Sequence, residues 1–165
     1  MAPKPELELP TIVVSQVDVA RLIRELNSLE DFFTLAEIRQ SGSAMEAPRL
    51  TRTLDGLATA NKLNLLEKSQ RQRLGEQLNE LLESAPLMHI SFASEPSPRI
   101  LAEIVKWFRA NIHKNALLQV GLQPTIAAGC VLRTPNKVFD LSLRTYLKQQ
   151  EPYLVQLISG AAHGS

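Results

Sequence analysis

The stretch LQPTIAAGCVLRTPNKVFDLSLRTYL, Leu122–Leu147, decides the fold of this chain. Two short apolar segments, Gly129–Arg133 and Val138–Asp140, flank the tetrapeptide TPNK. Proline at the second position of a tight turn and asparagine at the third are both favoured, so we predict a β-hairpin here.

A helix is predicted directly after the hairpin. Asp140 or Ser142 is expected to cap its N-terminus, because short polar side chains accept hydrogen bonds from the unpaired N–H groups of a first helical turn. Pro152 is expected to interrupt or restart this helix. Beyond it, the apolar face continues through Tyr153, Leu154, Leu157 and Ile158.

The segment before the hairpin predicts two more strands joined by a helix. Met88, Ile90 and Phe92 alternate with polar residues, which is strand periodicity. Ser97-Pro98 is typical of a helix start, and that helix is expected to end near Asn111. A strand at 118–122 completes a β-α-β unit. The region 86–159 is therefore predicted to be an α/β domain of order β-α-β-β-α with a mixed sheet.

The region 15–85 has helical periodicity and predicts three helices. The first begins at Ser15 and is broken at 40–43, the second is shorter and carries Leu50, Leu54 and Leu57 on one stripe, and the third runs over about 66–82. Ser15 with Asp18 three residues later fits a capping box. Arg71 is assigned to the outer face of the third helix. With 1–14 as an extended segment and 160–165 as a disordered tail, the fold class is α+β.

Four residues of the α/β region have specific expected environments. Ile100 and Trp107 are assigned to the inward face of the helix at 98–111, and Cys130 to a buried, unreactive position in a strand. Gly129 is expected to allow a close backbone approach or an unusual dihedral angle.

Composition and charge favour an ordinary globular protein. The formal net charge is +1, which gives no general electrostatic reason to bind nucleic acid or an anionic membrane. One cysteine excludes an internal disulfide. The N-terminus resembles neither a secretory signal nor a transit peptide, and no apolar run reaches the roughly 20 residues of a membrane span. We expect a cytoplasmic protein, with any membrane association through a partner.

The sequence offers no recognisable constellation for catalysis. Cys130 with His89 or His113 as base is a weak candidate, and the spacing of the histidines does not fit a zinc site. Phosphate loops and nucleophile elbows are absent from the sequence, so no enzyme activity, cofactor or metal is expected. Cations on the second and third helices alternate with carboxylates, which favours a solvated surface over a nucleic-acid interface.

The C-terminal pattern resembles the delta subunit of F-type ATP synthases, the family of the oligomycin-sensitivity-conferring protein. The residues that carry this resemblance are Pro124, Ile126, Gly129, Arg133, Asp140, Ser142, Arg144 and Leu147. The sequence departs from the family at Gln123, where aspartate is usual, and at Ala128, where a second glycine is common. Only three helices are predicted before the α/β region, whereas the family has a bundle of six.

The resemblance implies a non-catalytic stator subunit that links the catalytic head to the peripheral stalk during ATP synthesis coupled to proton transport. The implied partners are the head subunits and the b-type stalk subunit, at the cytoplasmic face of a bacterial cell membrane. The alternative is a helical adaptor with a delta-like domain that acts outside the synthase. The motif residues are assigned mainly structural roles, and the partner-binding residues are left open.

Overall fold

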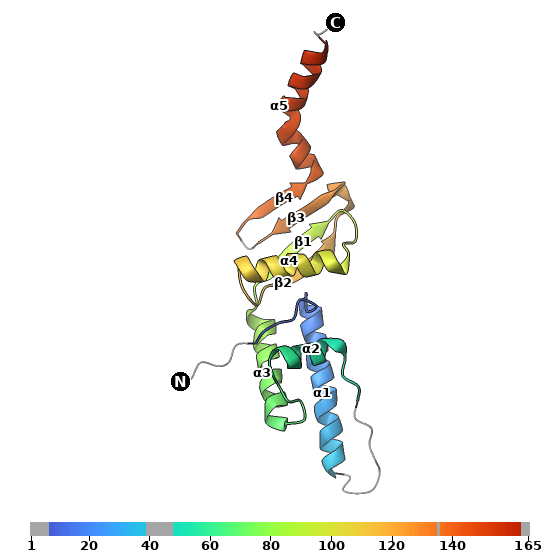
Figure 1. Ribbon diagram of the computed structural model, residues 1–165, viewed down its shortest axis with the longest axis vertical. Coiled ribbons are helices and arrows are strands. Elements are labelled where there is room, and N and C mark those ends of the chain that lie inside the picture. Colours follow the sequence, from blue (N-terminus) through green and yellow to red (C-terminus); the bar gives the residue numbers. More distant parts are fainter. Residues whose placement is uncertain (1–6, 39–47, 135, 163–165) are drawn as a thin grey trace. The chain divides into compact units, whose positions relative to one another are not determined.

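The computed structural model describes residues 7–38, 48–134 and 136–162. Pro135 of the predicted turn lies outside them. The elements, shown in Figure 1, are α1 (Gln16–Ile38), α2 (Arg52–Ala60), α3 (Lys68–Ser84), β1 (Leu87–Phe92), α4 (Pro98–Asn111), β2 (Leu117–Leu122), a 3-10 turn (Pro124–Ile126), β3 (Gly129–Arg133), β4 (Val138–Ser142) and α5 (Leu143–Ala162). The α+β class, with helices first and a mixed sheet after them, is confirmed.

The contacts within the chain divide it into two units. The first unit holds residues 1–86 and 101–117, and the second holds residues 87–100 and 118–165. Most of α4 therefore belongs to the unit of the N-terminal helices, although the sequence places it in the α/β region.

The first unit is built around leucines from three helices. Val19, Leu22 and Leu26 of α1 are buried, as are Leu74 and Leu78 of α3. The predicted capping box begins α1, since the Ser15 backbone N–H donates to Asp18 Oδ2 at 2.9 Å and the Asp18 N–H donates to Ser15 Oγ at 3.3 Å. Each fully buried leucine side chain contributes about 2 kcal/mol through removal of apolar surface from water.

Arg71 is buried, so its assignment to the outer face of α3 is wrong. Its side chain is 3% exposed, and its Nε donates to the Glu30 carboxylate of α1. Nη1 donates to the carbonyl oxygens of Leu65 and Leu66 at 3.0 and 2.9 Å, and the guanidinium lies 4.3 Å from the centroid of the Phe33 ring. A buried guanidinium is tolerated here because both a carboxylate and carbonyl oxygens satisfy it.

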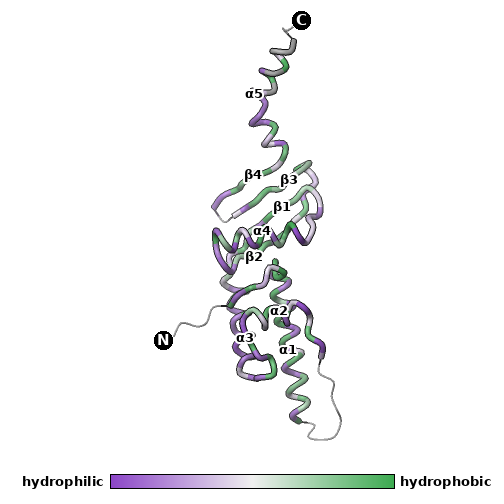
Figure 2. The backbone as a smooth tube through the Cα atoms, in the orientation of Figure 1, coloured by the Kyte–Doolittle hydropathy of each residue, from purple (hydrophilic) through white to green (hydrophobic). Residues whose placement is uncertain are grey.

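The sheet has the strand order β2-β1-β3-β4, so β4 is an edge strand. Its strands are largely hydrophobic in Figure 2. β1 pairs antiparallel with β3, and β3 pairs antiparallel with β4. The predicted hairpin is confirmed by this second pairing. Its turn closes with a 2.8 Å hydrogen bond from the Thr134 N–H to the Lys137 carbonyl oxygen.

Two inward assignments on α4 are wrong. Ile100 is 50% exposed and Trp107 is 57% exposed, whereas Val105 and Phe108 are buried. The buried stripe of α4 is thus narrower than its apolar composition suggests. Trp107 contacts Phe108 edge-to-face, with ring centroids 5.3 Å apart, and exposes the rest of its indole.

The last helix is continuous through Pro152 and reaches Ala162. The interruption predicted at Pro152 is therefore wrong, and the helix extends past the predicted boundary at 159. Across the described residues, none of the helices has the length and hydropathy needed to cross a membrane.

Candidate interaction surface

Gly129 occupies a backbone conformation that side chains disfavour. Its φ is +91°, and a Cβ at this position would lie 2.5 Å from the Leu141 carbonyl oxygen of β4. The residue therefore permits both the left-handed conformation and the close approach of two strands, as predicted. It fixes the end of the β3–β4 pairing, where it lies opposite Ser142.

Asp140 and Ser142 cap α5, as predicted. The Ser142 N–H donates to Asp140 Oδ1 at 2.9 Å, Thr145 Oγ1 donates to Asp140 Oδ2 at 2.8 Å, and the Thr145 N–H donates to Ser142 Oγ at 3.4 Å. Hydrogen bonds from the side chain and backbone of Ser142 and from Thr145, with a smaller contribution from the Arg144 charge, lower the pKa of Asp140. The junction between β4 and α5 is thus a defined corner.

The other residues of the motif have different environments. Ile126 is buried in the 3-10 turn that Pro124 begins, and Ala127 after it has a φ of +66°. The Leu143 N–H donates to the Ala128 carbonyl oxygen at 2.9 Å, which joins this turn to the start of α5. Three further motif residues, Arg133, Arg144 and Leu147, are exposed.

An apolar face runs in register across three strands of the sheet. Residues directly opposite in an antiparallel pair point to the same face, so Phe92, Cys130 and Leu141 form one row. Along this row the exposure rises from 9% at Phe92 to 62% at Leu141. Cys130 is half-buried, so its assignment to a buried position is wrong, because the neighbouring edge strand leaves this face partly open.

The exposure rises in the same direction along a second row on this face. Ile90 on β1 pairs with Leu132, which pairs with Phe139 on β4. Ile90 is 4% exposed and Phe139 is 44% exposed. The sheet therefore carries an apolar face that is covered at β1 and open at β4.

The same kind of surface continues along α5. Leu143, Tyr146 and Leu147 follow at three- and four-residue steps, and each is about half exposed. Tyr153 and Ile158 extend this stripe at helical spacing and are also exposed. Arg144, Lys148 and Glu151 occupy other positions around the helix.

We call the exposed residues at the corner the C-terminal apolar surface; it consists of Phe139, Leu141, Leu143, Tyr146 and Leu147. Five large apolar side chains exposed within nine consecutive residues are a candidate site of association, because single scattered ones are ordinary but several together are costly in water. The sequence identified Leu147 as a motif residue but gave no sign that the β4 residues would be open, since core and interface positions share one periodicity.

Cys130, the candidate nucleophile, and His89, a candidate base, do not lie on the same face of the sheet. Cys130 pairs with Phe92, whereas His89 pairs with Arg133, and these rows point to opposite faces. Partial burial also raises the pKa of the Cys130 thiol, which disfavours the thiolate. His113 accepts a hydrogen bond at Nδ1 from the Asn115 N–H at 3.2 Å. In the described part of the chain, no three histidine, cysteine, aspartate or glutamate residues lie together as metal ligands would.

No protein-family model matches the chain, and no curated protein matches it. The delta-like motif and the exposed apolar residues of β4 and α5 are the features of the chain that bear on its function.

Proposed function

We propose that this chain is a non-catalytic stator subunit of an F-type ATP synthase, which holds the catalytic head to the peripheral stalk while the rotor turns. The open apolar surface at β4 and α5 is the observation that supports this most directly. A connecting subunit needs stable contact surfaces rather than a cleft for a small molecule, and this corner provides an apolar one.

The proposal also draws on the residues that shape the corner. Gly129, Asp140 and Ser142 belong to the delta-like motif, and they fix the β3–β4 pairing and the start of α5. Their role is to hold Leu141 and Leu147 in place. The motif thus has a physical purpose in a docking subunit, because a rigid apolar surface loses little conformational entropy when a partner binds.

The proposed stalk partner contributes an amphipathic helix. Such a helix buries an apolar stripe at i, i+3, i+4 and i+7 in a groove of its receptor. The N-terminal helices are proposed to bind a short segment of the head. The protein would then reach the cytoplasmic face of a bacterial membrane only through these partners.

Co-purification from the native host tests the proposal. The tagged chain is isolated from membranes in mild detergent, and its partners are identified by mass spectrometry. Recovery of catalytic-head and stalk subunits in constant ratio is the expected result. Abundant tagged protein without either subunit would instead favour the alternative, a helical adaptor outside the synthase.

Matched variants test whether the C-terminal apolar surface makes the contact. Leu141→Ser and Leu147→Ser are expected to lower the recovery of the stalk subunit at least fivefold, because each removes about 2 kcal/mol of potential apolar burial. Val138→Ser and Val155→Ser are the controls. Val138 is 64% exposed on the opposite face of β4, and Val155 is 56% exposed outside the α5 stripe.

The controls decide between a specific and a general effect. Equal loss of the stalk subunit in all four variants would show that the chain was destabilised. Full recovery with Leu141→Ser and Leu147→Ser would exclude this surface as the docking site.

A further inference from the structure

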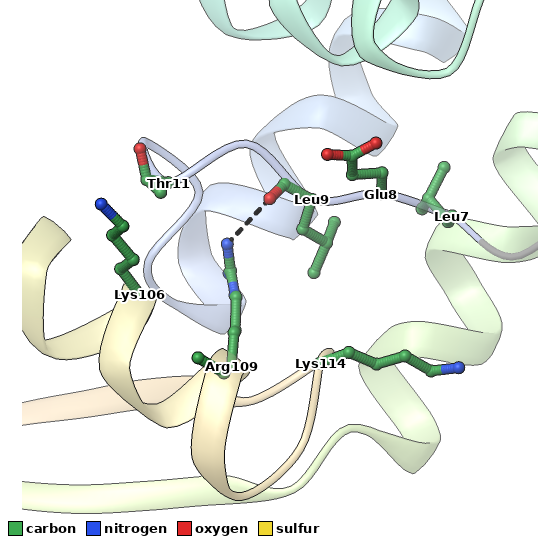
Figure 3. A pocket seen from close by; sticks show the side chains of 8 residues that line it. Leu7, Glu8, Leu9, Thr11, Lys106, Arg109 and Lys114 are labelled. Carbon is green, nitrogen blue, oxygen red and sulfur yellow. Dashed lines mark hydrogen bonds between the residues drawn. The ribbon is translucent and has the colours of Figure 1, made fainter.

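The N-terminal segment and the end of α4 form a pocket within the first unit. Its volume is about 510 Å³, and its lining includes Leu9 and Thr11 from the segment and Lys106, Arg109 and Lys114 from the other side. Figure 3 shows these side chains around the pocket. A pocket of this volume can hold a ligand as large as a few amino-acid residues, which is much larger than a single small ion.

Arg109 builds the wall of this pocket. Its Nε donates to the Ala116 carbonyl oxygen at 3.3 Å, and Nη1 donates to those of Leu9 and Pro10 at 3.1 and 3.0 Å. Nη2 donates to the Val13 carbonyl oxygen. These bonds tie the N-terminal segment to α4 and order both sides of the pocket before any ligand arrives.

The partners of Arg109 are neutral, so its charge is not cancelled by them. Four bonds to carbonyl oxygens use four of the five N–H groups of a guanidinium. Burial without a carboxylate lowers the pKa of Arg109 to about 10, which still leaves the group protonated at neutral pH. The pocket therefore has a permanent positive charge in its wall.

Two lysines extend this positive potential, and one carboxylate reduces it. Lys106 and Lys114 are exposed and lie on opposite sides of Arg109 in Figure 3. Lys114 also has an interaction within the chain, so it contributes charge rather than a vacant donor. Glu8 lines the same pocket, which leaves a formal charge of +2 from three cations and one anion.

We propose that this pocket binds a short acidic peptide segment of a protein partner. Cations at separated positions, with the exposed Ala110 and Thr11 beside them, match a ligand that carries carboxylates on both sides of a small apolar residue. A single inorganic anion would use only one end of this arrangement. The inference does not depend on the C-terminal apolar surface, because none of its residues lines this pocket.

Nuclear magnetic resonance titration of the full chain tests the proposal. The probe is a capped pentapeptide of alternating aspartate and alanine, and its uncharged counterpart has asparagine in place of aspartate. Saturable shifts of the amide signals of Thr11, Lys106 and Ala110 are expected with the acidic peptide only. The binding should weaken with added salt, since exposed charges are screened.

Variants of one lysine locate the site. Lys106→Gln is expected to weaken peptide binding roughly two- to fivefold, the range for loss of one exposed ion pair. Arg99→Gln removes a cation from the first turn of α4, which does not line the pocket, and should leave binding unchanged. Equal weakening by both variants would mean general charge attraction and would overturn the proposal.

Inorganic phosphate provides the second arm of the experiment. Phosphate that saturates the same amide signals as tightly as the peptide does would show a small-anion site, and the peptide proposal would be wrong. Absence of any saturable shift with the acidic peptide would also overturn it.

Discussion

At the scale of single residues, the backbone geometry at Gly129 leaves no room for a side chain. Gly129→Ala is expected to destabilise the protein by about 1–3 kcal/mol, because alanine is strained at a φ of +91° and its Cβ would meet the Leu141 carbonyl oxygen at 2.5 Å. Urea denaturation followed by circular dichroism measures the change.

Gly56→Ala is the matched control for this substitution. Gly56 lies in α2, and a Cβ added there would have no neighbouring atom within 4 Å, so alanine should stabilise the protein by up to about 1 kcal/mol. A loss of stability in Gly56→Ala as large as that in Gly129→Ala would contradict the geometric explanation.

The contact between Arg71 and Glu30 leads to a second prediction, about the stability of the first unit. Glu30→Gln is expected to cost roughly 2 kcal/mol, because it leaves the buried Arg71 guanidinium with neutral partners only. The free energy of unfolding at neutral pH tests this. The neighbouring substitution Asp31→Asn affects an exposed carboxylate and should change stability by less than about 0.5 kcal/mol. Similar losses in both variants would rule out a special role for the Arg71 contact.

Some residue environments followed from the sequence and others did not. Ser15, Asp18, Asp140 and Ser142 are recognisable because capping is local, with partners within a few positions along the chain. Arg71 contacts Glu30, which is 41 positions away in the sequence, so no local sequence pattern predicts that contact.

At the scale of elements, the cap of α5 is pH-dependent. The pKa of Asp140 is lower in the folded state than the ordinary value near 4, so its contribution is complete above that value and is lost as the pH falls through the folded pKa. The Ser142 amide signal, whose N–H donates to Asp140, should therefore shift below about pH 4.

Asp140→Asn separates this effect from general acid unfolding. The variant keeps a side-chain acceptor but has no titrating carboxyl, so the shift of the Ser142 amide signal below pH 4 should disappear. A Ser142 signal that still moves with the same midpoint would assign the titration to another group.

The sequence predicted the elements better than it predicted which faces are covered. The strand β4 was expected as half of a hairpin, and that is what it forms, yet its apolar residues are open to solvent. An alternating pattern reports that one face avoids water, but not whether the cover comes from the same chain or from a partner. Trp107 of α4 was wrongly predicted to face inward for the same reason.

At the scale of the whole molecule, residues 1–86 are not self-sufficient. The carbonyl oxygens of Leu9, Pro10 and Val13 are held by Arg109, which lies far along the chain. The Glu8 N–H also donates to Asn61 Oδ1 at 2.7 Å, a bond that a fragment of residues 1–86 retains. Such a fragment should therefore keep its helices but lose protection of the segment 9–13 from hydrogen exchange. In the full chain these amides should exchange at least tenfold more slowly.

Arg109→Gln in the full chain is the companion measurement. It removes the donors that hold the segment and leaves every other element present. Faster exchange confined to the segment and the end of α4 is expected. If the segment remains protected in both the fragment and the variant, it is held without Arg109 by its buried Leu7, Leu9 and Val13 side chains and by the hydrogen bonds between Glu8 and Asn61.

Because Cys130 lies in the row Phe92–Cys130–Leu141, the reactivity of its thiol can report whether a partner is bound at the C-terminal apolar surface. Cys130 is the single cysteine, it is half-buried, and its neighbour Leu141 belongs to the C-terminal apolar surface. A partner seated over Leu141 would hinder the approach of an alkylating reagent to the sulfur. The rate of thiol modification in the unaltered protein would then report, in real time, whether this corner is bound.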